Sequence, residues 1–127
     1  MIRSPADPKG ATTVLVVSNV PASVEHYVNV FGFTEDFVYG DPPTFAGVWR
    51  GEVVIHLQDG TMTHRPIGGG CVSLYVGDAM AAHAELEARG AQITVPPAPR
   101  DYGLVDFIAE DPDGNQLVWG SDLKSAE

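Results

Sequence analysis

The chain has 127 residues, enough for one domain, and 44% of them are hydrophobic, which is enough to form a core. Its formal net charge of −10 disfavours nucleic acid and anionic membranes as partners and would suit a cationic ligand, although an acidic surface can also serve solubility alone. A single cysteine excludes an intrachain disulfide, and residues 1–10 resemble a loose arm without the apolar core of a signal peptide. No apolar run reaches membrane-spanning length, so we expect a cytoplasmic protein.

The first part of the chain, residues 11–59, predicts a strand, a helix and three further strands. Ser18 or Asn19 can cap the helix and Gly32 ends it. The apolar residues of the helix recur every three or four positions, which predicts one buried face. These residues are Val24, Tyr27, Val28 and Phe31. The strands are expected at 12–17, 33–39, 45–50 and 53–58.

Residues 60–70 are polar and glycine-rich and predict a linker loop, after which the pattern restarts over residues 71–121. Asp78 is a suitable cap for a helix that ends at Gly90. The residues of this helix that we expect to face inward are Met80, Ala84 and Leu86. The strands are expected at 71–76, 91–95, 104–109 and 116–120, with a proline-rich loop over 96–100.

The two halves of the chain repeat each other. Val17-Ser18-Asn19 precedes the first helix as Val76-Gly77-Asp78 precedes the second. We therefore expect residues 1–127 to form a single α+β domain, in which two βαβββ modules make a curved mixed sheet. One helix would cover one face of each module, and the uncovered faces would leave a concave cleft, the kind of place where ligands usually bind.

The last two strands flank the turn Asp111-Pro112-Asp113-Gly114-Asn115. Pro112 presets φ at the second turn position, and Gly114 and Asn115 tolerate the positive φ that a tight reversal needs. The pattern is typical of a β-hairpin.

The repeated βαβββ order, this turn and Gly32-Phe33 after the first helix together resemble the vicinal oxygen chelate superfamily. This group includes glyoxalase I, extradiol dioxygenases, fosfomycin-resistance enzymes and bleomycin resistance proteins, and the resemblance covers about residues 11–121. The runs most similar to bleomycin resistance proteins are Gly32 to Phe37, Phe45 to Val48, Val54 to Leu57, and Tyr102-Gly103 ahead of Asp106-Phe107.

The resemblance implies a ligand site between aromatic side chains, because bleomycin resistance proteins hold a large flat cationic drug in this way. The positions that match their binding elements are Asp36, Phe37, Phe45 and Tyr102, and Trp49 could extend the surface. Strand alternation adds further cleft-facing candidates, namely His56, Ser73 and Tyr75. Phe37, Phe45 and Trp49 could equally be ordinary core residues.

The resemblance also raises the question of a metal site, because metal-dependent members take ligands from the first and last strands of each half. The matching positions are Thr12, His56, Cys71 and Val118. Only His56 and Cys71 could bind a divalent ion well, and Val118 cannot bind one, so the oxygen- and nitrogen-rich octahedral site is missing. We therefore expect no cofactor.

Three functional hypotheses follow. The first is a small-molecule binding protein that sequesters a planar cationic ligand, such as an antibiotic, without a metal. The second is a metal-dependent lyase, isomerase, dioxygenase or thiol transferase with one divalent ion, held by His56 with Glu52, Glu110 or Cys71. The third is an accessory domain without a site. The resemblance further implies a homodimer that completes its clefts across the interface, with exchanged arms or strands and residues 60–70 as a hinge.

Overall fold

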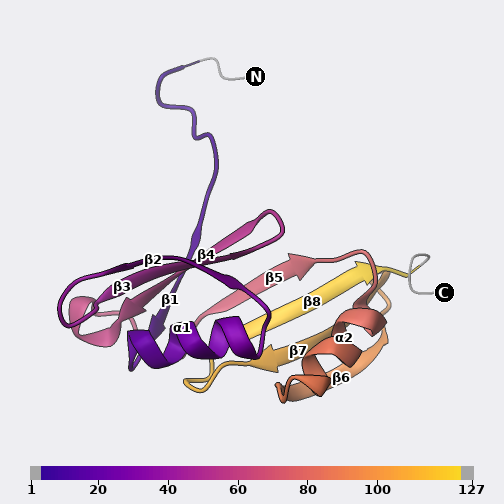
Figure 1. The fold of residues 1–127 in the computed structure, drawn as a ribbon. Coiled ribbons are helices and arrows are strands. Elements are labelled where there is room, and N and C mark those ends of the chain that lie inside the picture. Colours follow the sequence, from indigo (N-terminus) through magenta and orange to yellow (C-terminus); the bar gives the residue numbers. More distant parts are fainter. Residues whose placement is uncertain (1–3, 124–127) are drawn as a thin grey trace.

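The computed structural model describes residues 4–123 and shows the predicted βαβββ order twice (Figure 1). The first module contains β1 (Thr13–Val17), α1 (Val20–Asn29), β2 (Thr34–Tyr39), β3 (Phe45–Arg50) and β4 (Val53–Asp59). The second contains β5 (Cys71–Tyr75), α2 (Ala79–Ala88), β6 (Gln92–Pro99), β7 (Leu104–Glu110) and β8 (Gln116–Asp122). A short 3-10 helix, η1 (Gly60–Met62), begins the segment between the modules. Neither α-helix of the described chain is long and apolar enough to cross a membrane.

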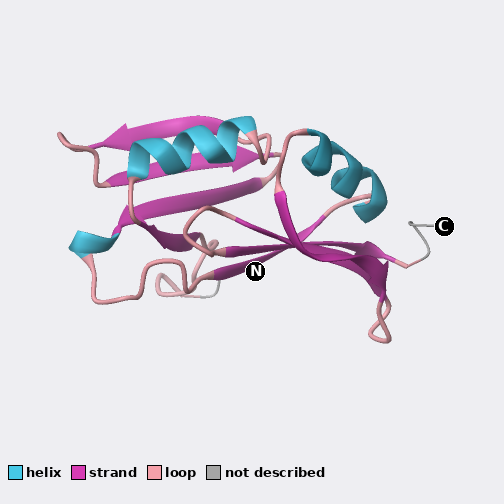
Figure 2. Ribbon diagram, turned by 90° about the horizontal axis from the view of Figure 1, so that it is seen from below, coloured by secondary structure: helices cyan, strands magenta, loops and turns pink. Residues whose placement is uncertain are grey.

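Each module forms its own mixed four-stranded sheet, so the expected curved sheet consists of two sheets. Sheet 1 has the order β1-β4-β3-β2 and sheet 2 the order β5-β8-β7-β6, with one parallel pair in each. In sheet 1, α1 packs on β2, β3 and β4, and in sheet 2, α2 packs on β6, β7 and β8 (Figures 1 and 2). The α+β class is therefore confirmed, and each sheet keeps one face that its helix does not cover, which we call its open face.

The two helices begin at equivalent caps but bury different kinds of side chain. The Asn19 side chain accepts a hydrogen bond from the Ala22 N–H, and the Asp78 side chain accepts from Met80 and Ala81. Helix α1 buries the face marked by Val24 and Tyr27, as predicted. In α2 the buried residues are Ala79 and Leu86, while Met80 is 47% exposed and Ala84 is exposed. The prediction for Met80 and Ala84 is therefore wrong, because alanines lie all around this helix and do not mark a face.

Strand β6 continues through the proline-rich segment 96–99, which was expected to form a loop. It runs to Pro99, although its pairing with β7 shifts register between Ile93 and Val95 and again before Ala98. Strand β6 is the outer strand of sheet 2, where proline is tolerated because the missing N–H need not serve a neighbour. The prolines in residues 96–100 therefore indicate an edge strand and not a loop.

A single hydrophobic core joins the two modules. Tyr27 and Phe31 of the first module meet edge to face, with ring centroids 5.0 Å apart. Phe107 and Trp119 of the second module stack at 6.2 Å and belong to the same cluster of buried residues. The modules therefore hold a fixed relative position, which sets where the two open faces lie.

The turn between β7 and β8 supplies the polar part of this junction. Asn115 is fully buried, and its Nδ2 donates to the Val16 carbonyl of β1 at 3.0 Å and to Asp111 at 2.9 Å. Its Oδ1 accepts from the Gly70 N–H at 2.9 Å. Asp111 is also buried and accepts a 3.0 Å hydrogen bond from the Tyr27 hydroxyl. The predicted hairpin turn is thus also the contact between the modules.

We expect Asn115→Ala to lower the free energy of unfolding by about 2–4 kcal/mol, because the Gly70 N–H loses its acceptor and the Val16 carbonyl and the buried Asp111 carboxylate each lose a donor. Urea denaturation would measure the change. Asn19→Ala, which removes only the exposed cap of α1, is the control and should cost about 1 kcal/mol. Equal losses for the two variants would show that the buried turn does not hold the modules together.

Candidate functional site

The open face of sheet 1 carries most of the aromatic residues predicted for the site. In this sheet Phe37 pairs with Gly47, which pairs with His56, and Phe45 pairs with Gln58. Paired residues project to the same face of a sheet, so these side chains share the face opposite α1. Trp49 lies on the same face towards the end of β3, paired with Val54. His56 therefore lies on this face, as predicted, together with Val54 and Gln58 of the same strand.

Three of these side chains form an aromatic cluster, which we define as Phe37, Phe45 and His56. The two phenyl rings stack with centroids 6.0 Å apart, and the His56 ring meets them edge-on at 5.5 and 5.1 Å. Gly47 makes this arrangement possible, because a Cβ at that position would collide with the Phe37 ring. A cavity of about 380 Å³ opens beside the cluster, between Tyr39 and Met62.

The open face of sheet 2 carries a different set of groups, centred on Asp106. The register aligns Tyr75 with Gly120 and Asp106, and Ser73 with Val118. A cavity of about 310 Å³ lies among them and is also lined by Tyr102. Ser73 and Tyr75 thus share this face, as predicted.

Asp106 is a buried carboxylate that organises this second surface. Arg100 Nε donates to Asp106 Oδ1 at 2.8 Å, and the Tyr102 hydroxyl donates a hydrogen bond to Oδ2. The hydrogen bond to Asp106 raises the pKa of the Tyr102 phenol and also raises the pKa of Arg100. Neither Asp106 nor Arg100 was predicted as a site residue. The available signal was a lone acidic residue in the otherwise apolar run from Leu104 to Ala109.

Within one chain, the aromatic cluster and the groups around Asp106 do not lie together. The cavity beside the aromatic cluster and the cavity beside Asp106 share no lining residue. Asp36 lies in a bulge of β2, where the pairing skips from Glu35 to Phe37, and lines neither cavity. The predicted residues therefore fall into two separate groups, one on each open face.

The side chains of one chain do not fit the metal site that the superfamily implies. Val14 lies beside His56 in the parallel pair β1–β4, and Ser73 lies beside Val118 in β5–β8. Cys71 is exposed on the other sheet, paired with Gln116. Among residues 4–123, no group of three or more His, Cys, Asp or Glu side chains is placed to hold a metal ion. An aliphatic side chain such as Val14 or Val118 offers no ligand atom.

Apolar side chains are exposed on both open faces and around them. Tyr39 is 70% exposed and Tyr75 is 78% exposed, and Trp49, Val54 and Tyr102 are also exposed. This apolar exposure is more than a few scattered residues and indicates contact surfaces.

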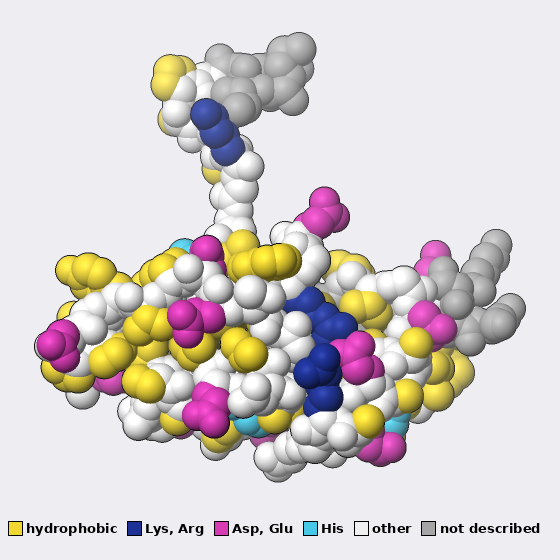
Figure 3. Space-filling model, in the orientation of Figure 1, with side chains coloured by type: hydrophobic (Ala, Val, Ile, Leu, Met, Phe, Trp, Pro, Cys, Tyr) yellow, Lys and Arg dark blue, Asp and Glu magenta, His cyan; other side chains and the backbone are white. Residues whose placement is uncertain are grey.

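Basic side chains form a stripe between the helices on the face shown in Figure 3. Arg50 and Arg89 each pair with Glu85 of α2.

Comparisons with known proteins agree with this fold. Residues 10–118 match the family model described as "Glyoxalase/Bleomycin resistance protein/Dioxygenase superfamily". No curated protein matches the chain.

Several solved structures are similar along nearly their whole length. A bleomycin-binding protein from Streptomyces verticillus, complexed with copper(II)-bleomycin, has a TM-score of 0.74 and 29% identity, over 90% of this chain and 96% of that one. A superfamily member from Sphaerobacter thermophilus has a TM-score of 0.75 and 27% identity, over 87% and 94%. Lactoylglutathione lyase from Agrobacterium tumefaciens has a TM-score of 0.75 and 20% identity, over 93% and 96%, and shows likeness of fold alone.

We expect Asp106→Asn to lower the pKa of Tyr102, because the charged acceptor that holds the phenol proton is removed while Arg100 stays nearby. A titration of the Tyr102 ring followed by NMR would measure this pKa. Asp101→Asn removes a neighbouring carboxylate with a smaller influence on the Tyr102 pKa and is the control. An unchanged Tyr102 pKa in Asp106→Asn would contradict the hydrogen-bonded arrangement.

Proposed function

Because the chain belongs to the Glyoxalase/Bleomycin resistance protein/Dioxygenase superfamily, we propose that it binds a planar cationic small molecule, such as an antibiotic, without converting it. One observation carries this proposal: stacked aromatic rings lie on an open sheet face where a metal-dependent relative would need ligands. The similar protein from Streptomyces verticillus is complexed with copper(II)-bleomycin, which supports a ligand of this kind.

The aromatic cluster is suited to a flat ligand. An aromatic ring stacked on Phe37 or Phe45 would gain about 0.5–1.5 kcal/mol beyond the burial of area. A cationic ring would gain more over the ring faces and in the field of a chain whose net charge is −10. Glu35 and Asp36 are exposed on β2 next to Phe37, so acidic groups also lie close to the proposed site.

A homodimer would join the two groups of residues into one complete site, with the aromatic cluster as one half-site and the residues around Asp106 as the other. Each half-site alone is a shallow cavity of about 380 or 310 Å³, whereas small-molecule sites usually bury most of the ligand surface. We propose that the open face of sheet 1 in one copy faces the open face of sheet 2 in the other. The exposed Tyr39, Trp49 and Tyr75 would be buried there, and residues 4–12, which project from the body of the molecule, could reach across (Figure 1).

A metal-dependent enzyme is the second candidate, and one observation favours it. Cys71, Gln116 and Glu110 occupy one row across β5, β8 and β7, so a second copy could add His56 to them. About one divalent ion per chain, lost in His56→Ala, would favour this alternative over metal-free binding.

We expect Phe37→Ala to weaken binding of metal-free bleomycin or ethidium by about tenfold, because one stacking surface is lost. Isothermal titration calorimetry on the full chain would measure the dissociation constant. Val38→Ala is the matched control, since Val38 is exposed on the opposite face of the same strand. Unchanged affinity in Phe37→Ala, or an equal loss in Val38→Ala, would exclude the aromatic cluster as the site.

A further inference from the structure

The turn between β6 and β7 places two of its side chains against the open face of sheet 2. It runs from Arg100 to Gly103, and a 2.7 Å hydrogen bond from the Arg100 N–H to the Leu104 carbonyl closes it. The side chains of Arg100 and Tyr102 both reach Asp106 in the following strand. Asp106 is only 6% exposed, and with Tyr102 it lines the cavity of about 310 Å³ on this face.

Arg100 neutralises this carboxylate but is not among the residues that line the cavity. Its Nε donates to Asp106 Oδ1 at 2.8 Å, and its Nη2 donates to the Asp106 and Pro96 carbonyls, both at 3.1 Å. A buried charge is tolerated when it is paired and hydrogen-bonded in this way. A ligand in the cavity would therefore meet Tyr102 and Asp106 without facing the guanidinium.

Asp106 fixes the direction of the Tyr102 hydroxyl. A tyrosine hydroxyl has one proton to donate and lone pairs that accept. Here the proton is donated to Asp106 Oδ2, while Oδ1 is held by Arg100. The Tyr102 oxygen can therefore offer only lone pairs to a ligand, and the charged carboxylate strengthens it as an acceptor because linked hydrogen bonds polarise each other. The Tyr102 side chain is 63% exposed, so a ligand can reach it.

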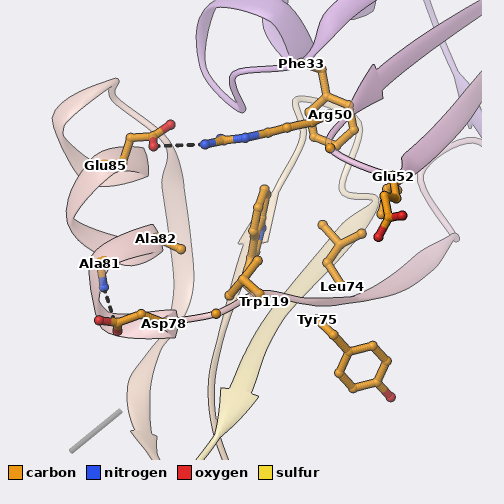
Figure 4. Close-up of a pocket in the computed structure, with 14 residues that line it drawn as sticks. Phe33, Arg50, Glu52, Leu74, Tyr75, Asp78, Ala81, Ala82, Glu85 and Trp119 are labelled. Atoms are coloured by element: carbon orange, nitrogen blue, oxygen red, sulfur yellow. Dashed lines mark hydrogen bonds and ion pairs between the residues drawn. The ribbon is translucent and has the colours of Figure 1, made fainter. Parts of the chain in front are cut away.

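The other polar side chains of the cavity are hydroxyls that adapt to a ligand. Ser73 and Tyr75 are two positions apart in β5 and share the open face. Figure 4 shows the Tyr75 side chain pointing away from Trp119 and α2, which agrees with this placement. A hydroxyl that is free to rotate can donate or accept. Among residues 4–123, the side chains that line the cavity include no lysine, arginine, histidine, asparagine, glutamine or tryptophan, so none of them is a donor only.

We propose that this cavity binds an N–H group of the ligand, with the Tyr102 oxygen as acceptor and Asp106 as the positioning residue that holds it in this role. The inference rests on the proposed function, in which the aromatic cluster of another copy would supply the stacking surface. It narrows the ligand class to planar cations that carry N–H donors at their edge, such as aromatic amines or amidinium groups. A cation whose edge nitrogens are fully alkylated would stack on the cluster but could not use this acceptor.

Asp106→Asn should reverse the polarity of the Tyr102 hydroxyl. The Arg100 Nε–H needs an acceptor, so the new carbonyl oxygen takes the place of Oδ1 and the amide NH₂ faces Tyr102. The amide then donates to the Tyr102 oxygen, and the phenol proton turns towards the cavity. This variant keeps the ring and the hydroxyl of Tyr102 but loses the acceptor.

The test compares two planar cationic dyes that share one ring system. Proflavine carries an amino group at each end of its acridine ring, whereas acridine orange carries dimethylamino groups there and has no N–H at those positions. Isothermal titration calorimetry on the full chain would give both dissociation constants. We expect the ratio of the acridine orange constant to the proflavine constant to fall about threefold to tenfold in Tyr102→Phe, because only proflavine loses a hydrogen bond.

Two further variants separate the positioning role from a structural one. Asp106→Asn should lower the same ratio, and its folding is checked by thermal melting. Tyr102→Phe removes a single hydroxyl and keeps the test decisive if Asp106→Asn does not fold. Asp101→Asn is the matched control, since it removes an exposed carboxylate of the same turn, acts on both dyes alike and should leave the ratio unchanged.

An unchanged ratio in Tyr102→Phe, an equal weakening of both dyes by that variant, or the same fall in Asp101→Asn would overturn the proposal. Phe37→Ala distinguishes this failure from failure of the proposed function, because lost stacking should weaken both dyes alike. If Phe37→Ala weakens both dyes while Tyr102→Phe leaves the ratio unchanged, only this inference fails. If neither dye binds, or Phe37→Ala has no effect, the proposed function fails and this inference fails with it.

Discussion

The buried side chain of Asn115 is the interaction on which the arrangement of this molecule depends. Its amide connects three segments that are far apart in sequence, namely β1 through Val16, the segment before β5 through Gly70, and its own turn through Asp111. A buried amide must keep all of these partners, because water cannot replace a hydrogen bond that is lost in the interior. The second module therefore has one position against the first, and both open faces follow from it.

The two modules repeat each other, but only the second has a long turn that contacts the helix region of the other module. The long turn of the second module completes its contact with α1, whereas the short turn of the first leaves a cavity of about 520 Å³ beside α2. The open faces are a separate consequence of having one helix per sheet, since each helix covers one face and leaves the other uncovered. The asymmetry of the turns and the exposure of the sheets thus give the chain two different kinds of surface.

Much of the fold could be predicted from the sequence, because strand alternation, helix caps and the repeat are local patterns. The Asp111–Asn115 turn was predicted from its φ preferences, but its role between modules was not, since partners such as Val16 are distant in sequence. The inward face of α2 was mispredicted where alanine carries no periodic signal, and Asp106 was missed because its partners are known only from the structure. The side chains predicted for one cleft lie on two faces, and sequence alone does not show how a second copy would join them.

In the proposed dimer, the aromatic cluster of one copy and the cavity beside Asp106 and Tyr102 of the other form one site. The most direct measurement mixes two variants, Phe37→Ala and Tyr102→Ala, each defective in one half-site, and titrates the mixture with metal-free bleomycin after subunit exchange. In the proposed dimer, each mixed pair would contain one site with both halves intact, so binding that is weak in either variant alone should reappear in the mixture. If the mixture binds no better than the separate variants, although subunits have exchanged, the half-sites do not belong to one shared site.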